Sequence, residues 1–196
     1  MNKPLIIGIT GGIGSGKTTF AEILRQMGFF VYNSDTEARR LQNENLVVRN
    51  KLIETFGQDI YNSNYLDRKK LSTIVFGNPD LLKKINTIVH PAVLEDFLSW
   101  KQLHSSNFFL FLETAILFES KFNLITDKVI LITASENIRI SRVMKRDGIK
   151  EELVRLRIKN QLSDIEKIKL ADVVINTDDG LPSQNVINNI LSELAN

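Results

Sequence analysis

The chain has 196 residues with 25 basic and 23 acidic side chains, and its net charge of +2 argues against broad nucleic-acid binding. The absence of cysteine excludes disulfides, thiolate metal sites and cysteine nucleophiles. No apolar run approaches the length of a membrane span, so we expect a soluble, cytoplasmic protein, a monomer or weak homo-oligomer without nucleic-acid or membrane partners.

The first predicted elements are a buried strand over residues 5–9, a glycine-rich loop and a helix. The loop, residues 11–18, fits the pattern Gly-x-x-x-x-Gly-Lys-[Ser/Thr], and we call it the phosphate loop. An ordinary glycine-rich turn is the alternative, but the order strand, loop, helix makes a chance match rare. Apolar residues then recur at helical spacing until a glycine is placed to end the helix: Phe20, Ile23, Leu24, Met27 and Gly28.

The residue types of this loop suit a bound polyphosphate. Glycines let main-chain N–H groups approach phosphate oxygens, and the positive end of the following helix points at the same charge. In this pattern Lys17 reaches the terminal phosphates and the Thr18 hydroxyl ligates Mg²⁺. The sequence therefore predicts an NTP site, with contacts from the loop and the start of the helix: Gly12, Ile13, Gly14, Ser15, Gly16, Lys17, Thr18 and Thr19.

Four further strand-like runs follow in chain order, with helical patterns between most of them. We expect strands over residues 29–32, 108–112, 128–133 and 172–176. This alternation predicts an α/β fold, a three-layer sandwich around a five-stranded parallel sheet. Ligands bind at the carboxyl ends of strands in such sheets, so the ends of the first three strands are where we expect the site.

The helical segments differ in character. Residues 36–106 are almost wholly helical, too long for a simple crossover, and predict a helical substrate region with breaks at Gly57, Gly77-Asn78-Pro79 and Pro91. A charged helical stretch covers residues 136–168, with Gly148 as its joint. A last helix over residues 184–194 is expected to bury its apolar side chains: Val186, Ile187, Ile190, Leu191 and Leu194.

Two carboxylates stand at predicted strand ends. Asp35 follows the second strand, where a kinase needs a carboxylate to orient an acceptor hydroxyl and take its proton. A helix N-cap formed by Ser34 or Asp35 is an equally good reading, and one carboxylate can fill both roles. Glu113 ends the third strand, as a Mg²⁺-linked acidic residue does; a cap or a solvated strand end is the alternative.

Arginines gather in the charged stretch between the last two strands. Arg139, Arg142 and Arg146 fall at offsets of three and four on one helical face, and Arg155 and Arg157 follow Gly148. Mobile arginines of this kind neutralise charge on a transferring phosphoryl group. A solvated basic face is the ordinary alternative, paired with Glu136, Glu151 and Glu152. The place of the segment between two strands of a nucleotide-binding sheet favours a lid.

Several motifs together indicate a known family. The opening Ile9-Thr10-Gly11-Gly12-Ile13-Gly14-Ser15-Gly16-Lys17 is more specific than a generic phosphate loop. Further matches follow in order: Asp35 with Ala38-Arg39, Phe56-Gly57, Leu66-Asp67-Arg68, His90-Pro91, Leu117-Phe118-Glu119, Arg142 with Arg146, Gln161, and Ala171-Asp172 leading to Asn176. Over essentially its whole length the chain resembles the dephospho-coenzyme A kinase family. It departs from it in Thr18, where relatives have Ser, and in residues 113–119, which lack the usual proline.

The resemblance implies an ATP- and Mg²⁺-dependent kinase that phosphorylates the ribose 3′-hydroxyl of dephospho-coenzyme A, a small-molecule partner. It implies a core of residues 1–35, 107–137 and 169–196, an acceptor-binding insert over 36–106 and a lid over 138–168. The alternatives are another small-molecule kinase, with a nucleoside or nucleotide acceptor, and a nucleotide-dependent switch. The Asp-x-x-Gly and Asn-Lys-x-Asp motifs of a guanine-specific switch are missing from the sequence.

The resemblance also implies roles for single residues. Asp35, Lys17 and Arg142 would be catalytic, with Asp35 as the general base. Thr18 would hold Mg²⁺, and Arg142, Arg146 and Asn176 would join the phosphate loop in binding ATP. Asp35, Arg68 and His90 would line the acceptor side.

Overall fold

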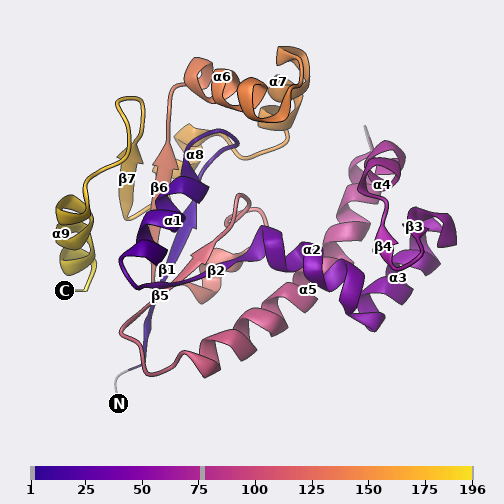
Figure 1. The fold of residues 1–196 in the computed structure, drawn as a ribbon, viewed down its shortest axis with the longest axis horizontal. Helices are drawn as coiled ribbons and strands as arrows, with labels where there is room; N and C mark the ends of the chain where they lie inside the picture. The colour runs from indigo at the N-terminus through magenta and orange to yellow at the C-terminus, as the bar shows by residue number, and fades with distance from the viewer. Residues whose placement is uncertain (1–2, 76–77, 196) are drawn as a thin grey trace. The chain divides into compact units, whose positions relative to one another are not determined.

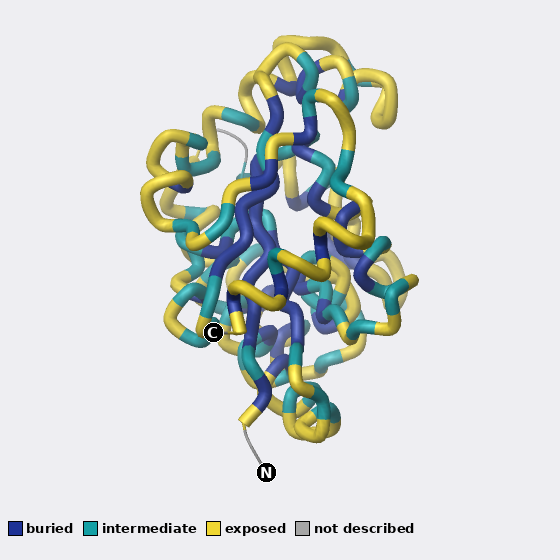
Figure 2. Tube along the Cα trace, turned by 90° about the vertical axis from the view of Figure 1, so that its left-hand side faces the viewer, coloured by how far each residue is buried: buried dark blue, intermediate teal, exposed yellow. Residues whose placement is uncertain are grey.

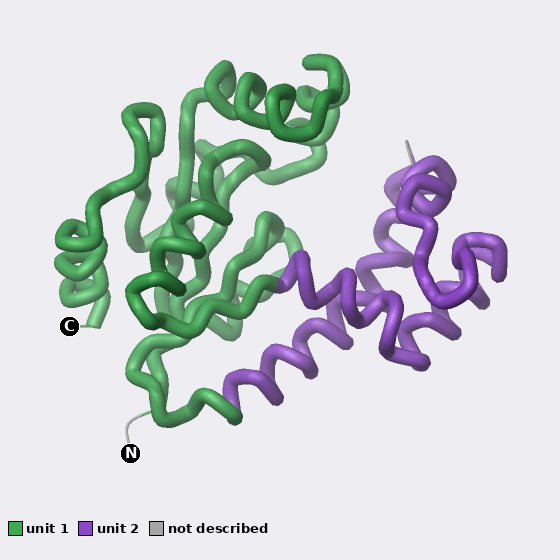
Figure 3. Tube along the Cα trace, in the orientation of Figure 1, with its two compact units in different colours: residues 1–33, 103–196 green, residues 34–102 purple. Residues whose placement is uncertain are grey.

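The computed structural model describes residues 3–75 and 78–195 and divides the chain into two compact units (Figure 3). Unit 1 is formed by the chain up to Asn33 and from Leu103 onward, and unit 2 by Ser34–Gln102.

Unit 1 is built on a parallel sheet (Figure 1). In the described residues its five strands lie in the order β2-β5-β1-β6-β7, and neighbours are parallel throughout. The predicted α/β fold with a five-stranded parallel sheet is therefore confirmed. The strand bounds are β1 Leu5–Thr10, β2 Phe30–Asn33, β5 Phe109–Glu113, β6 Lys128–Thr133 and β7 Val173–Asn176.

Apolar side chains cover the strands of this sheet, and Figure 2 shows buried positions running along them. One cluster joins strand residues such as Ile9 and Phe111 to two helices, α1 (Lys17–Gln26) and α9 (Gln184–Leu194). The three central strands β1, β5 and β6 are mostly buried, and strands buried on both faces read as continuous apolar runs.

The last helix has the predicted bounds but not the full predicted core. Ile187, Leu191 and Leu194 are buried, whereas Val186 is 46% exposed. The buried three recur at offsets of four and three, so they form one stripe. Val186 lies about 100° around the helix from Ile187, outside that stripe.

Glycines in left-handed conformations end helices where the sequence predicted. Gly28, with φ 88°, follows α1, and Gly148, with φ 65°, caps α6 (Glu136–Asp147) before α7 (Glu151–Lys159). Such positions are strained for a residue with a Cβ. The short helices η2 (Phe122–Ile125) and α8 (Asp164–Ile168) complete unit 1.

Unit 2 is mainly helical, as expected, but it contains a small hairpin that the sequence reading missed. Its helices are α2 (Ser34–Glu44), α3 (Leu46–Phe56), η1 (Gln58–Ile60), α4 (Arg68–Val75) and α5 (Pro79–Leu103). The hairpin pairs β3 (Tyr61–Asn62) with β4 (Tyr65–Leu66), and Ser63 at its turn has a φ of 56°. The Asn-Ser-Asn sequence at 62–64 is the signal that could have identified it.

The helix breaks were predicted with mixed success. Gly57, with φ 91°, separates α3 from η1. The expected break at Pro91 is wrong, since α5, which is 25 residues long in total, runs through this position. Proline removes one helical hydrogen bond, but buried Val89 and Val93 anchor the helix on both sides. The expected break at Gly77-Asn78-Pro79 involves Gly77, which lies outside the described residues, although α5 does begin at Pro79.

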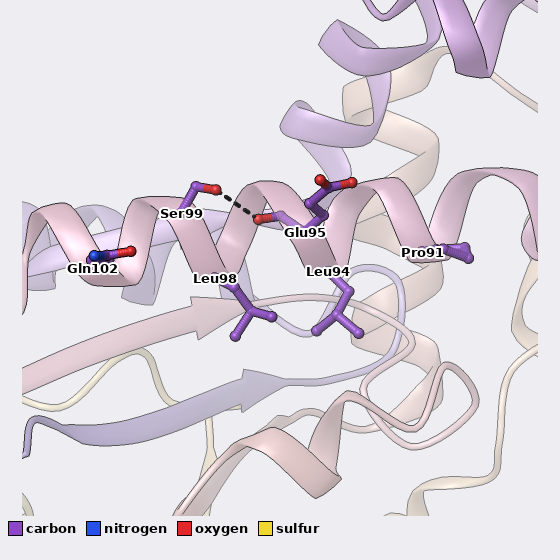
Figure 4. Close-up of a pocket in the computed structure, with 6 residues that line it drawn as sticks. All are labelled: Pro91, Leu94, Glu95, Leu98, Ser99 and Gln102. Carbon is purple, nitrogen blue, oxygen red and sulfur yellow. Dashed lines mark hydrogen bonds between the residues drawn. The ribbon is translucent and has the colours of Figure 1, made fainter.

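One face of α5 borders a shallow pocket (Figure 4). Its lining residues recur at helical spacing: Pro91, Leu94, Glu95, Leu98, Ser99 and Gln102. None of the residues predicted for catalysis or binding lines this pocket. Despite the length of α5, no helix within the described ranges is long and apolar enough to cross a membrane.

Candidate active-site residues

The phosphate loop joins β1 to α1, and the start of α1 is open to an anion. Gly14 and Gly16 have φ values of 80° and 94°, which turn the chain into the helix. Gly16 is the N-cap residue, no side chain caps the helix start, and the first turn contains no acidic residue. The first N–H groups of a helix have no intrahelical acceptors, so here they are left for a ligand.

The glycines of this loop also serve the packing of the protein itself. A Cβ built on Gly14 would lie 2.5 Å from the main-chain oxygen of Arg139 at α6. A Cβ on Gly11 would overlap the main-chain oxygen of Ile132. Part of the glycine pattern is therefore required by contacts with β6 and α6, and not only by a bound phosphate.

Lys17 and Glu113 form a buried ion pair at the foot of this loop. Lys17 Nζ lies 3.1 Å from Glu113 Oε1, and the two side chains are 9% and 1% exposed. Thr18 Oγ1 donates to the same carboxylate oxygen at 2.9 Å, and Asn33 Nδ2 donates to Oε2 at 2.6 Å. Arg25 completes the surroundings at 3.7 Å. Reading Glu113 as a cap or solvated strand end is therefore wrong.

The sheet order explains why Glu113 is so well surrounded. Strand β5 lies between β1 and β2, and Glu113 pairs in register with Ile9 and with Asn33. Its side chain therefore meets groups that follow both neighbouring strands. The sequence shows that Glu113 ends an apolar run, which marks it as a candidate site residue. Its partners could not be predicted in this way, because they depend on the strand order.

Arg142 holds the phosphate loop to the segment after β7. Its guanidinium donates to Thr177 Oγ1 at 2.9 Å, to the Thr177 main-chain oxygen at 2.7 Å and to the Gly14 main-chain oxygen at 3.4 Å. Thr177 Oγ1 in turn donates to the main-chain oxygen of Ser15 at 2.8 Å. The sequence reading missed Thr177 and selected its neighbour Asn176, whose Oδ1 accepts from Asp178 N at 2.7 Å.

The other arginines of the charged stretch have separate partners. Arg139 is buried and paired with Asp164 at 3.1 Å. Arg146 pairs with Asp147, and this hydrogen bond raises the pKa of Arg146. Arg155 lies within reach of Glu136 and Glu151, as the solvated-face alternative expects for this residue. The arginines predicted to share one basic face therefore make separate contacts with different partners.

Gln161 is a second residue to which the sequence reading gave no role. It lies between α7 and α8, and its Oε1 accepts the main-chain N–H of Ile13 in the phosphate loop at 2.9 Å. Nearby, Asp164 accepts from Thr133 Oγ1 at 3.0 Å, next to the end of β6. The predicted lid segment is therefore hydrogen-bonded to the phosphate loop by a side-chain amide.

The predicted acceptor residues all belong to unit 2. Asp35 lies in the first turn of α2, which begins at Ser34, so Asp35 is inside the helix and not its N-cap. Arg68 opens α4 and donates to Gln42 Oε1 at 3.1 Å. His90 lies in α5 and is half-buried, and this burial lowers its pKa.

The oxygen donors beside the phosphate loop fit Mg²⁺. Thr18 Oγ1 and the Glu113 carboxylate adjoin each other, and Mg²⁺ is commonly bound by one or two such groups together with substrate phosphates and water. The described residues contain no cluster of three or more His, Cys, Asp or Glu side chains suited to a metal.

Comparison with known proteins decides the family. The sequence profile described as dephospho-CoA kinase matches residues 5–183. The chain belongs to the dephospho-CoA kinase family. It is 39% identical over 178 residues to dephospho-CoA kinase of Fusobacterium nucleatum, covering 90% of this chain and 91% of the relative. It is 43% identical over 157 residues to the Porphyromonas gingivalis protein of that name, covering 80% and 77%.

Solved structures agree with this membership. The crystal structure of TT1252 from Thermus thermophilus is 32% identical, with a TM-score of 0.83 over 98% of this chain and 99% of the other. Dephospho-CoA kinase from Campylobacter jejuni is 28% identical, with a TM-score of 0.65 over 97% and 96%. Shikimate kinase from Acinetobacter baumannii, 16% identical with a TM-score of 0.55 over 97% and 94%, shares the fold. Family membership makes this chain an ATP-dependent kinase.

Proposed function

We propose that the protein transfers the γ-phosphate of ATP to the ribose 3′-hydroxyl of dephospho-coenzyme A, giving coenzyme A and ADP. The observation that carries the proposal is the buried group formed by Lys17, Glu113 and Thr18 beside an uncapped helix start. This arrangement brings a cation, oxygen ligands and helix N–H groups together from the start of α1 and the end of β5. The names of the relatives supply the acceptor.

Unit 1 provides the donor side of this proposal. The loop N–H groups and the positive end of α1 bind the β- and γ-phosphates, and Lys17 stabilises the charge of the terminal group. Thr18 and Glu113 would hold Mg²⁺, which supplies charge neutralisation at the phosphates when bound. Glu113 also holds the Lys17 ammonium by an ion pair beside the loop that receives the phosphate.

Unit 2 provides the acceptor side. Asp35 accepts the proton of the 3′-hydroxyl while the oxygen of that hydroxyl attacks the γ-phosphorus. A new bond forms between that oxygen and phosphorus, while the bond to the β–γ bridging oxygen breaks and ADP leaves. Arg68 and His90 bind and shape the acceptor, and burial keeps His90 neutral near pH 7 because it lowers the pKa.

Three residues complete the proposed nucleotide site. Arg142, which contacts Gly14 and Thr177, neutralises charge that develops on the transferring group. Asn176 shapes the turn after β7 beside the nucleotide. Arg146 approaches the phosphates when the segment around α6 and α7 closes and excludes water.

A direct assay tests the proposal. Purified protein is incubated with ATP, Mg²⁺ and dephospho-coenzyme A. The products are separated by chromatography, and their masses are measured by mass spectrometry. We expect equimolar ADP and an acceptor heavier by one phosphate, with the 3′ position identified by NMR. Adenosine and a panel of nucleotides serve as control acceptors. ADP formation with these acceptors but none with dephospho-coenzyme A would refute the assignment.

A further inference from the structure

Helix α2 places a guanidinium one turn after the proposed catalytic base. Asp35, Arg39 and Gln42 occur at offsets of four and three, so they share one face of the helix. With a rise of about 1.5 Å per residue, Arg39 lies about 6 Å along the axis from Asp35, and Gln42 about 10 Å. This face therefore presents a carboxylate at one end and positive charge further along.

Arg68 brings a second guanidinium to the same face from α4. Its Nη2 donates to Gln42 Oε1 at 3.1 Å, which fixes the side chain beside the third position of the stripe. Burial lowers the pKa of Arg68, and the charge of Arg39 lowers it further. The two guanidinium groups are thus close enough to repel each other, although each is on a separate helix.

Among the described residues this pair of positive charges has no acidic counter-ion. In the described part of the chain no carboxylate forms an ion pair with Arg39 or Arg68. The neighbouring Arg40 shows the contrast, since it is paired with Glu37 at 2.6 Å and with Asp96 at 2.5 Å. Arg49, a third arginine near Tyr61, also has neutral partners, the main-chain oxygen of Ser63 and the ring itself.

Two guanidinium groups without a carboxylate partner among the described residues, one from α2 and one from α4, suit a dianionic ligand. Guanidinium binds phosphate through two parallel hydrogen bonds, and a diphosphate offers oxygens to both side chains at once. Dephospho-coenzyme A carries a diphosphate on the 5′ carbon of the same ribose that presents the 3′-hydroxyl. The 3′-hydroxyl and the 5′ carbon are attached to neighbouring carbons of the ring, so the hydroxyl and the diphosphate are separated by a distance of the same order as one helical turn.

We propose that Arg39 and Arg68 bind the 5′-diphosphate of the acceptor and thereby set its 3′-hydroxyl at Asp35. The inference rests on the proposed function, because it takes its acceptor from there. According to this inference, the two positive charges of Arg39 and Arg68, both in unit 2, select the acceptor. A nucleoside without the diphosphate would then lack the contacts that hold it in place.

Steady-state kinetics of three variants test this. Arg39→Gln and Arg68→Gln each remove one charge from the pair, and Lys51→Gln removes one from an exposed position on α3 as the matched control. We expect the KM for dephospho-coenzyme A to rise about 10- to 100-fold in both arginine variants, because each loses a charge-assisted hydrogen bond. The KM for ATP and the control variant should stay within twofold of wild type.

The outcomes separate this inference from the proposed function. If the wild-type protein makes no product from dephospho-coenzyme A, the proposed function fails. If the wild type is active and Arg39→Gln keeps the wild-type acceptor KM, only the diphosphate site fails. An equal rise in the KM for ATP also overturns it, since Arg39 would then act on the donor or on the fold. Arg39 is exposed, and an unchanged melting temperature confirms that its variant is folded.

Discussion

Lys17 and Glu113 form a buried ion pair, 3.1 Å between Nζ and Oε1, at the point where the phosphate loop enters α1. The residues are 96 positions apart in the chain. Because Glu113 is enclosed, its charge is balanced by Lys17 and by the donors Thr18 and Asn33 rather than by water. The pair therefore links the stability of the protein at the end of β5 to the position of the lysine that is proposed to bind the nucleotide.

Glu113→Gln should destabilise the protein by about 3–5 kcal/mol, the cost of removing one charge from a buried ion pair. Guanidinium chloride unfolding, followed by circular dichroism, measures the loss. The double variant Lys17→Met with Glu113→Gln is the control, and it should lose less because both charges are gone. A single variant within about 1 kcal/mol of wild type would contradict the description of this pair as dry and closely coupled.

Bound nucleotide should compensate for part of this loss. In Glu113→Gln the phosphates of ATP bring negative charge to Lys17 in place of the lost carboxylate, so ATP should raise the melting temperature of the variant more than that of wild type. Turnover should nevertheless fall, because one of the proposed Mg²⁺ ligands has lost its charge. Scanning calorimetry with and without ATP checks the first expectation. Equal ATP-induced shifts in both proteins would count against it.

Asp35→Asn should lower kcat about 10²- to 10⁴-fold and leave the KM for ATP nearly unchanged, since a general base acts on the acceptor. Asp80→Asn is the matched control, a carboxylate in the first turn of another helix of the same unit. It should keep wild-type kcat. Both variants are assayed by ADP release at saturating dephospho-coenzyme A. An Asp35→Asn enzyme within a few-fold of wild type would remove this residue from the base role.

The sequence was informative where structure depends on local pattern. Continuous apolar runs located every strand of the parallel sheet, and Gly28 and Gly148 marked helix ends because their backbone needs a positive φ. The pattern Gly-x-x-x-x-Gly-Lys-Thr placed the phosphate loop between β1 and α1. Each of these features is decided by neighbours within a few residues.

Features decided by distant neighbours were not predictable in the same way. Thr177 reaches Ser15 across 162 residues, and Gln161 reaches Ile13 across 148. Glu113 is buried because β5 lies between β1 and β2, which no local pattern states. The continuous helix at Pro91 likewise depends on packing on both sides, which outweighs the local preference of proline.

Gln161→Ala should raise the KM for ATP about 2- to 10-fold, the value of one hydrogen bond to a main-chain N–H of the phosphate loop. The KM for dephospho-coenzyme A should not change, because the side-chain hydrogen bond of Gln161 is made to the donor loop. Gln184→Ala, at the first position of α9, is the control. The variants are compared by ADP release at varied ATP concentration. A selective effect on acceptor KM would contradict the assigned contact.

His90 should make stability depend on pH. Burial lowers its pKa below the ordinary 6.5, so below that pH the unfolded chain takes up a proton that the folded protein does not. Stability from this residue is present above pH 6.5 and is lost as the pH falls toward the folded pKa. His90→Gln should therefore lose less stability than wild type between pH 7.5 and 5.5. Urea midpoints at both pH values check this, and parallel losses would contradict it.

Four hydrogen bonds join Arg142, Thr177 and the phosphate loop. Variants of the two residues can therefore separate the contact with the loop from the charge of the guanidinium. Thr177→Val breaks the hydroxyl contacts but keeps the guanidinium, and should raise the KM for ATP about 2- to 10-fold with little effect on kcat. Arg142→Ala removes a proposed donor to the transferring phosphoryl group, and should lower kcat about 10²- to 10³-fold as well. Arg142→Lys should recover part of kcat, because it restores the charge without the planar fork. If Arg142→Ala and Thr177→Val have the same effect on kcat and on KM, Arg142 acts by holding the loop to Thr177, and its proposed part in neutralising the transferring group is wrong.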